Sequence, residues 1–470
     1  MKTFKNILIV ALIALCVYQL AGFWYGDGFS GSVFALNLNL SGKKTAYDYA
    51  SLVKPGRIII GDGSKDGFAI IYNNIDGSSV KEKFDGAIKS ALGNGVFVSS
   101  GAIDYGAFIG RASVMYEYMF PMPTDDFCKA FSKSSAPYAP RFGYFNAVAV
   151  IPDADGFSIY FLNYDTGNEY EYSVAYDKTS DLMSAALAVR DLSAIKYEMA
   201  EAEDSNLEPG MLSAVIGAGT GISYYPETIS YPYLLNGESL LSNIAGKASF
   251  FFKNPASVTP DSSNGVYTFR ENKTYVTYQQ NNVITYAVYS DYGTGGKSAA
   301  SFMPAYSAAA AFLKRDTTLA NEYYMSGYEY DDINGVWDFY FDPAVNNLPA
   351  AFPESAAQDT KMSHFIEFKV AGGTVTEYKR LACDFLSGGA AELKALKSLY
   401  AAFNIANGGI SGDETILSAD LRYSADYNDI SASKESAVTL SWFFVTEYGV
   451  TDSETGGAVM KTAQTSYPAE

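Results

Sequence analysis

Residues Ile7–Trp24 read ILIVALIALCVYQLAGFW, eighteen consecutive residues without a formal charge. A helix of about 20 apolar residues spans the hydrocarbon core of a bilayer, so this stretch is long enough to cross a membrane. Lys2 and Lys5 precede it, and Asp27 follows it. Because positive charge is retained on the cytoplasmic side, we predict a single-pass cell-membrane protein with a cytoplasmic N-terminus and an extracellular body.

Two processed forms compete with this uncleaved anchor. A secretory signal peptide cleaved after Val33-Phe34-Ala35 is one of them, but that site lies far beyond the apolar run. The run is also longer than the ~7–15 residues of a usual signal-peptide core. A lipoprotein signal ending at Cys16 is disfavoured because Cys16 lies in the middle of the run, behind a bulky leucine. Trp24 and Tyr25 suit the membrane interface, so the sequence favours the anchor and leaves cleavage as the alternative.

One face of the predicted membrane helix carries small residues. Ala11, Ala14, Tyr18 and Ala21 follow one another at spacings of three, four and three residues, which places them on the same side of a helix. Small side chains allow two membrane helices to approach closely. We therefore predict that these four residues contact a partner helix, although alanine is also common in any apolar helix.

The composition indicates a large folded body with an acidic surface. Of the 470 residues 48% are hydrophobic, and 38 are tyrosines, which favour strands. A chain of this length can form about two to four domains. The formal net charge is −19. Such a surface is repelled by nucleic acid and by anionic lipid headgroups, so nucleic-acid binding is disfavoured.

Alternating apolar runs separated by turns predict antiparallel β structure. The expected hairpins are Arg57–Ile60 with Phe68–Tyr72, Asn146–Pro152 with Phe157–Asn163, Glu322–Tyr330 with Val336–Phe341, and His364–Val370 with Thr374–Leu381. Further strands are expected at Leu36–Leu40, Arg111–Phe120, Tyr170–Tyr176, Gly265–Phe269, Tyr275–Tyr278 and Val283–Tyr289. Two last strands, Ile416–Tyr423 and Ala437–Thr446, are expected to close the sheet of the C-terminal region.

Apolar residues at helical spacing predict helices between these strands. They are expected over Val80–Leu92, Ser180–Val189, Ser239–Phe252, Ser298–Leu313 and Ala390–Ala406. Thr124 is expected to cap a short helix over Asp125–Phe131. Helices packed on antiparallel sheets constitute an α+β fold, which is the predicted class.

An acidic stretch poor in apolar residues, Glu201–Glu208, is followed by Pro209 and Gly210 and marks a domain boundary. The predicted order is a cytoplasmic tail (1–6), a transmembrane anchor (7–25), a first extracytoplasmic α+β domain (26–208), a second α+β unit (209–315), a third α+β unit (316–448) and a flexible tail (449–470). The second and third units share one order of helices and hairpins, so we predict that they are related.

Residues able to carry catalysis or bind metal are sparse. His364 is the one histidine and begins an alternating segment, so we interpret it as a strand residue. A Ser-His-Asp triad would need it, and no G-x-S-x-G motif surrounds any serine. One histidine with the distant Cys128 and Cys383 does not supply a zinc ligand set, so no metal or cofactor is predicted. The sequence leaves open whether these two cysteines form a disulfide.

Three further motifs resemble known sites only loosely. Gly217–Gly221 lacks the lysine and the spacing of a phosphate-binding loop, and we interpret it as a flexible loop. Asp153–Gly156 lacks the later glutamate of a calcium loop, and we interpret it as a turn. Carboxylate pairs such as Asp331 and Asp332 lie in predicted turns or linkers. A glycosidase needs only two carboxylates at a fixed separation, so a wall hydrolase is a less favoured alternative.

Several stretches, taken in order, resemble the YycH/YycI family. They are ILIVALIALCVYQLAGFWYGD at the start, KPGRIIIGDG (54–63), ASVMYEYMFPMPTDDFCKAF (112–131), FSIYFLNYDTGNEYEY (157–172), FFFKNPASVTPDSSNGVYTFRENKTYVTYQQNNVITY (250–286), HFIEFKVAGGTVTEYKR (364–380), ILSADLRYS (416–424) and SAVTLSWFFVTEYG (436–449). The family's usual ending has a proline before the tryptophan, whereas Ser441 precedes Trp442 here. None of these stretches is a catalytic motif, and the length is closer to YycH than to YycI.

The resemblance implies a membrane-anchored accessory protein of a two-component system. Members of this family have one transmembrane helix and an exterior body without enzymatic activity. They contact a WalK-like sensor histidine kinase and a second YycH/YycI-like protein through the helix and the exterior domains. The resemblance does not give the sign of regulation. A surface adhesin or a solute-binding module is the alternative function that an acidic, tyrosine-rich exterior body allows.

Overall fold

The computed structural model describes residues 54–63, 68–72, 79–104, 107–108, 110–138, 141–153, 155–175, 178–193, 195–197, 221–224, 227–230, 249–254, 258–263, 266–279, 281–289, 301–316, 319, 321–345, 348–387, 392–395, 416–425, 435–446, 449–452 and 458–459. Strands dominate this part of the chain, and every pair of named strands is antiparallel. A few helices accompany the sheets, so the α+β class is confirmed. The predicted strand Leu36–Leu40 and linker Glu201–Glu208 lie outside the described residues.

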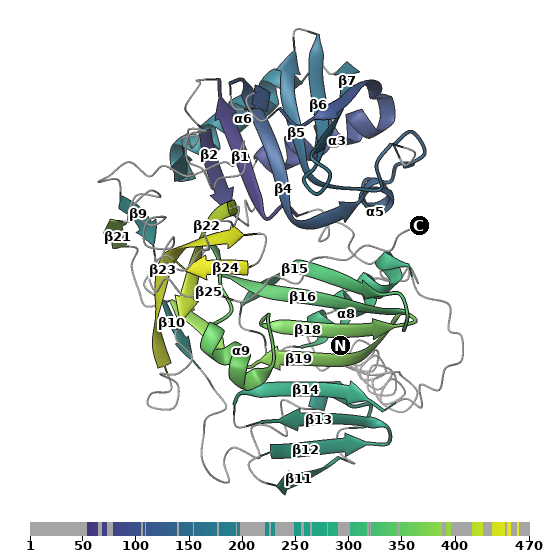
Figure 1. Ribbon diagram of the computed structural model, residues 1–470, viewed down its shortest axis with the longest axis vertical. Helices are drawn as coiled ribbons and strands as arrows, with labels where there is room; N and C mark the ends of the chain where they lie inside the picture. The colour runs from purple at the N-terminus through teal and green to yellow at the C-terminus, as the bar shows by residue number, and fades with distance from the viewer. Residues whose placement is uncertain are drawn as a thin grey trace, which may run out of the picture.

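An eight-stranded sheet forms one end of the molecule (Figure 1). Its strands, in spatial order, are β3 (Val96–Ala102), β7 (Asn168–Ala175), β6 (Gly156–Asn163), β5 (Tyr144–Asp153), β4 (Ala112–Pro123), β1 (Arg57–Asp62), β2 (Phe68–Tyr72) and β8 (Ile195–Tyr197). Helices α3 (Ser79–Asn94) and α6 (Thr179–Ser193) pack on one face of this sheet, and α5 (Thr124–Ala130) follows β4. The predicted hairpins β1–β2 and β5–β6 are confirmed.

A nine-stranded sheet forms the other end (Figure 1). Its order is β11 (Thr259–Ser263), β12 (Val266–Glu271), β13 (Thr274–Tyr278), β14 (Val283–Val288), β19 (Thr374–Leu381), β18 (Ile366–Ala371), β16 (Val336–Val345) and β15 (Glu322–Asp331), with β17 (Leu348–Pro349) beside β16. Helix α8 (Phe302–Arg315) packs against β16, β18 and β19. Because β14 pairs with β19, strands from both sides of the boundary predicted at residue 315 share one sheet.

The last long strands form a separate sheet, which corrects the prediction that they close the nine-stranded one. β22 (Ile416–Ala425) and β23 (Glu435–Thr446) pair with each other, and β23 also pairs with β10 (Glu227–Ser230) and β24 (Gly449–Asp452). β20 (Asp384–Ser387) and β25 (Ala458–Val459) complete this six-stranded sheet. The predicted flexible tail therefore contains two strands. β24 forms because its backbone pairs with β23, and the composition of the tail alone does not reveal this partner.

Three helix predictions also need correction. Glu392–Ala395 is a strand, β21, paired with β9 (Gly221–Tyr224), although its leucine spacing fits a helix. Pairing with a distant strand satisfies the backbone hydrogen bonds and overrides the local pattern. Thr124 is the first residue of α5 and not its cap, because Pro123 occupies the cap position. Of the helix predicted over Ser239–Phe252, the described part is a short 3₁₀ turn, η1 (Ser249–Phe251).

One row of large apolar side chains, which we call the aromatic row, crosses seven strands of the nine-stranded sheet. Residues directly opposite each other in register are Phe269, Val276, Tyr286, Tyr378, Phe368, Phe339 and Tyr328. Opposite residues in a sheet share a face, so α8 can cover the row with Phe302 and Phe312. The ring centroids of Phe302 and Phe339 lie 5.7 Å apart, and those of Phe312 and Phe368 lie 5.8 Å apart.

The eight-stranded sheet has an aromatic core of its own beneath α3. The rings of Phe84 and Tyr116 stack with centroids 3.8 Å apart, and the rings of Phe127, Phe145 and Phe161 meet edge to face nearby. Such pairs contribute about 0.5–1.5 kcal/mol each beyond the burial of their area. This core fixes the positions of α3 and α5 on one face of the sheet.

The two large sheets meet where β4 approaches β15. Tyr328 lies at the end of the aromatic row, and its hydroxyl donates to the Pro121 carbonyl at 3.0 Å. The ring of Tyr328 also packs against Phe120, with centroids 5.9 Å apart. A single buried tyrosine thus belongs to both cores and joins the two ends of the molecule.

A buried ion pair lies beside the aromatic row. The Arg380 guanidinium donates to Asp316 Oδ2 at 2.8 Å, and the Tyr378 hydroxyl donates to the same oxygen at 2.7 Å. Side chains of both ion-pair partners are almost wholly buried. Burying a charge without its partner is costly, so this arrangement fixes the end of α8 against β19.

We predict that Asp316→Ala lowers the free energy of unfolding by about 3–5 kcal/mol, because Arg380 is then left buried without its counter-charge. Urea denaturation is the measurement. Lys369→Met is the matched control: it breaks an exposed ion pair and should cost about 1 kcal/mol or less. Equal losses in the two variants would contradict the assigned role of Asp316.

Candidate functional site

The residues predicted to contact a partner helix are Ala11, Ala14, Tyr18 and Ala21. They lie outside the described residues, so this role stays a prediction. Across the part of the chain that the structure describes, no helix has the length and apolar character needed to cross a membrane.

His364 lies just before β18 and forms a cluster with a serine and an aspartate. Its Nδ1 lies 2.8 Å from Asp342 Oδ2 and 3.2 Å from Ser326 Oγ. In a Ser-His-Asp triad the serine and the acid contact opposite nitrogens, so that the imidazole passes a proton between them. Here both oxygens meet the same nitrogen. This geometry suits a buried hydrogen-bond network and not the activation of a serine nucleophile.

The other motifs weighed for chemistry form ordinary local structure. Asp153 and Gly156 face each other across the β5–β6 turn, as predicted. Asp331 accepts hydrogen bonds from the backbone and the side chain of Asn334 within the β15–β16 turn. Gly217–Gly221 lies outside the described residues except for Gly221, which begins β9. Within the described ranges, no group of three or more His, Cys, Asp or Glu side chains is arranged to hold a metal ion.

Cys128 and Cys383 are separate thiols. Cys128 in α5 and Cys383 after β19 are both buried, and neither forms a disulfide. Burial raises the pKa of the Cys128 thiol to about 12 and also raises the pKa of Cys383. The thiolate is the reactive form, so both side chains act as core residues at neutral pH.

A broad polar surface remains on the side of the nine-stranded sheet opposite α8. We call it the open face and define it by two rows of residues in register. One row is Glu329, Asp338, Lys369 and Glu377; the other is Tyr340, Glu367, Lys379, Thr285, Thr277 and Thr268. Each of these side chains is at least partly exposed. Their face is fixed because the aromatic row occupies the alternate positions of the same strands.

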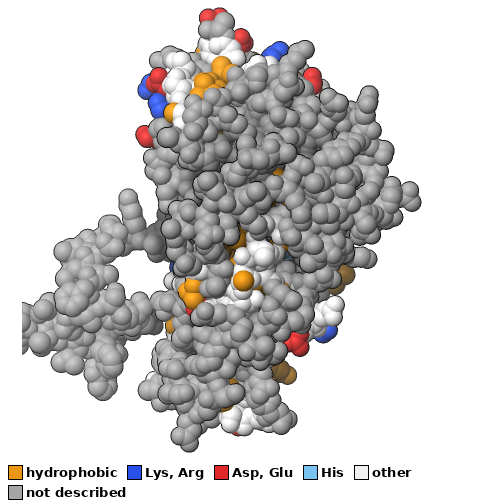
Figure 2. All heavy atoms as spheres, turned by 90° about the vertical axis from the view of Figure 1, so that its left-hand side faces the viewer, with side chains coloured by type: hydrophobic (Ala, Val, Ile, Leu, Met, Phe, Trp, Pro, Cys, Tyr) orange, Lys and Arg blue, Asp and Glu red, His pale blue; other side chains and the backbone are white. Residues whose placement is uncertain are grey.

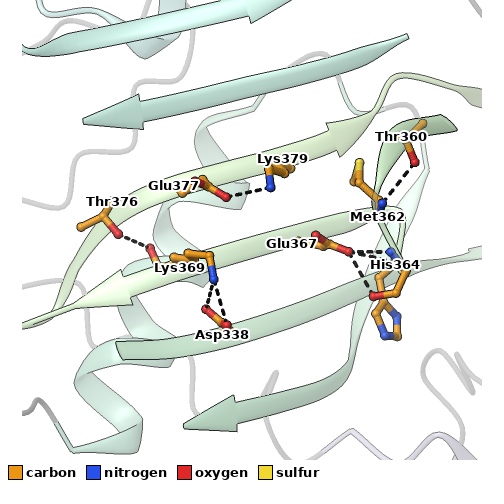
Figure 3. Close-up of polar contacts among 10 residues, drawn as sticks. Asp338, Thr360, Met362, His364, Glu367, Lys369, Thr376, Glu377 and Lys379 are labelled. Atoms are coloured by element: carbon orange, nitrogen blue, oxygen red, sulfur yellow. Dashed lines mark hydrogen bonds and ion pairs between the residues drawn. The ribbon is translucent and has the colours of Figure 1, made fainter. Parts of the chain in front are cut away.

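Charges on the open face are paired within and across strands (Figure 3). Lys369 Nζ lies 3.1 Å from Asp338 Oδ2 on β16, and Lys379 Nζ lies 3.0 Å from Glu377 Oε1 on β19. Burial lowers the pKa of Lys369, but the carboxylates of Asp338, Glu377 and Glu367 together raise it by more, so this lysine stays charged. Glu367 accepts hydrogen bonds from the backbone and the hydroxyl of Ser363.

This arrangement presents paired charges and hydroxyls side by side on neighbouring strands. Both charge signs and several hydroxyls are presented on one face of the sheet, which suits complementary polar contacts. Sequence reasoning missed this face; the signal that could have indicated it is the alternation of charged with apolar residues in Glu367-Phe368-Lys369-Val370 and Glu377-Tyr378-Lys379. Figure 2 shows a similar mixture elsewhere, with acidic and basic side chains close together at the end of the molecule formed by the eight-stranded sheet.

Comparison with known proteins gives one informative match. The fold resembles that of YycH from Bacillus subtilis with a TM-score of 0.53, covering 85% of this chain and 95% of that chain at 12% sequence identity. An uncharacterized protein from Eubacterium rectale matches 55% of this chain and 82% of its own, at 13% identity and a TM-score of 0.33. No protein-family model and no curated protein matches the sequence. The likeness to YycH concerns the fold.

We predict that Cys128 and Cys383 react with a disulfide reagent such as Ellman's only after unfolding. Burial both blocks access and disfavours the thiolate, which is the attacking species. The rate of thiol release is measured on a Cys16→Ser variant with and without urea. Rapid reaction of either thiol in the native protein would contradict the buried placement.

Proposed function

We propose that this protein is a membrane-anchored, extracytoplasmic regulator that binds a two-component sensor histidine kinase of the WalK type. The observation that carries the proposal is the YycH-like fold over 85% of the chain. The charge-free stretch Ile7–Trp24 supports a membrane anchor, and the resemblance of quoted sequence stretches to the YycH/YycI family supports the same assignment.

The local chemistry supports a binding role over a catalytic one. In the His364 cluster the serine and the aspartate meet the same ring nitrogen, which does not activate a nucleophile. The open face instead offers paired charges on a rigid sheet, held from behind by the aromatic row. A rigid polar surface of this kind can recognise a partner without a large rearrangement.

Regulation of a kinase requires differential binding. A bound protein shifts the balance between two signalling states only to the extent that it binds one state more tightly than the other. We propose two contacts for this purpose: the helix face of Ala11, Ala14, Tyr18 and Ala21 within the membrane, and the open face outside it. A second YycH/YycI-like protein is the further partner that this proposal includes.

Replacing Ala14 and Ala21 together with leucine should weaken binding to the purified kinase in lipid nanodiscs. Larger side chains prevent close helix approach, and we expect roughly a fivefold loss of affinity, about 1 kcal/mol. Ile9→Ala with Leu20→Ala, on the opposite side of the predicted helix, is the control and should keep the affinity. An unchanged affinity in the leucine variant would refute the helix contact.

Reversing the two lysine charges of the open face tests the exterior contact in the same binding assay. We expect Lys369→Glu with Lys379→Glu to reduce affinity about tenfold, because like charges then face the partner's acidic groups. Lys89→Glu with Lys253→Glu makes the same change in net charge on exposed residues elsewhere. If both pairs of variants bind equally well, the open face is not the contact.

A further inference from the structure

His364 lies in a short segment between two sheets. The segment Met362–Phe365 connects α9 (Glu354–Thr360) to β18, and the side chains of Met362 and Phe365 are buried. The Phe365 ring packs against Phe352 and Phe385, with centroids 5.2 Å and 5.8 Å away. These rings belong to one apolar cluster with residues of the six-stranded sheet, namely Leu421, Tyr423, Leu440 and Trp442. The segment therefore belongs to the packing that joins the two sheets.

One carboxylate holds this segment at two points. Asp342, at the end of β16, is 7% exposed. Its Oδ1 accepts the backbone N–H of Phe365 at 3.0 Å, and its Oδ2 lies 2.8 Å from His364 Nδ1. The Ser326 hydroxyl also hydrogen-bonds to this carboxylate. The imidazole stacks on the Tyr340 ring, with centroids 4.6 Å apart. A buried carboxylate is most stable when its partner is a cation.

The charges that face His364 come from four strands. Asp342 on β16, Glu367 on β18 and Glu329 on β15 are acidic, whereas Arg422 on β22 is basic. Three carboxylates favour the imidazolium form, and the single guanidinium opposes it. Arg422 belongs to the six-stranded sheet, so the electrostatic environment of His364 includes both sheets that its segment joins.

We propose that His364 and Asp342 form a proton-dependent lock that holds the six-stranded sheet against the nine-stranded sheet. When His364 is protonated, the Asp342 carboxylate has its counter-charge and the segment is fixed. When the proton is lost, the hydrogen bond can persist but the buried carboxylate faces a neutral ring. The lock goes beyond the proposed function and does not depend on which partner the protein binds.

The direction of the pH dependence follows from the two pKa shifts. Burial lowers the pKa of His364, but Asp342 and Glu367 together raise it by more, so the net pKa lies above the ordinary 6.5. The contribution of protonated His364 to the free energy of unfolding is therefore fully present below pH 6.5. It is lost as the pH rises through the folded-state pKa. Burial raises the pKa of Asp342, but His364 and the hydrogen-bond donors lower it below 3.8. The lock is thus strongest in mildly acidic solution and weakens as the pH rises through the raised pKa of His364.

The first test is an NMR titration of the one histidine in the full-length protein. With ring-labelled histidine and no polyhistidine tag, the chain gives a single imidazole signal. We expect a titration midpoint above 6.5, the ordinary value for this side chain. A midpoint at or below 6.5 would overturn the proposal, and this result needs no variant to fold.

The second test measures hydrogen exchange at about pH 6 and about pH 8, corrected for the intrinsic pH dependence of exchange. Two amides report on the lock: Phe365 N–H, bound to Asp342, and Ala351 N–H, which donates to the Tyr423 carbonyl of β22 at 2.8 Å. We expect several-fold greater protection of both amides at the lower pH.

Variants decide whether this pH dependence belongs to His364. His364→Asn keeps a side-chain N–H donor but cannot carry charge, so the difference between the two pH values should disappear. Lys89→Gln removes an exposed charge on α3, which packs on the eight-stranded sheet, and should keep the wild-type difference. A pH dependence that persists unchanged in His364→Asn would overturn the proposal. Because both readouts concern the protein alone, their failure is distinct from failure to bind a kinase.

Discussion

The row of apolar side chains from Phe269 to Tyr328 is the constraint on which the C-terminal half of the structure depends. It crosses seven strands in register, and a shift of one residue in any strand would turn that strand's side chain to the opposite face. The row fixes α8 on one side of the sheet and, by alternation, the paired charges on the other. Through Tyr328 it also reaches the eight-stranded sheet, so a single packing arrangement positions both ends of the molecule.

Local structure could be predicted well from the sequence because its signals are local. Each of the four expected hairpins has a turn between two apolar runs, and each is present. Pairings between distant segments could not be predicted, since no local pattern specifies that Val283 lies opposite Leu381 or that Glu227 lies opposite Val438. The helix expected over Ala390–Ala406 was wrong at its start for the same reason, because β9 provides the pairing.

The candidate sites likewise combine residues that the sequence singled out with partners that only the fold brings near. His364 was recognised as the one histidine, but its partners Asp342 and Ser326 lie on two other strands, and only the fold brings them together. The bulge at Ser326 turns that side chain toward the imidazole, which alternation alone does not predict. The open face was not predicted from the sequence, because its two rows form only when nonlocal strands pair in register. The predicted helix contacts at Ala11, Ala14, Tyr18 and Ala21 lie outside the described residues and stay predictions.

Affinity purification of the full-length protein from solubilised native membranes, followed by mass spectrometry, tests the central claim most directly. A parallel sample carries an unrelated transmembrane helix in place of residues 7–25. If the protein is a kinase regulator, a sensor histidine kinase co-purifies with the native anchor and is lost or depleted with the exchanged one. Absence of any sensor kinase from both samples would contradict the account and would direct attention to ligands of the exterior body.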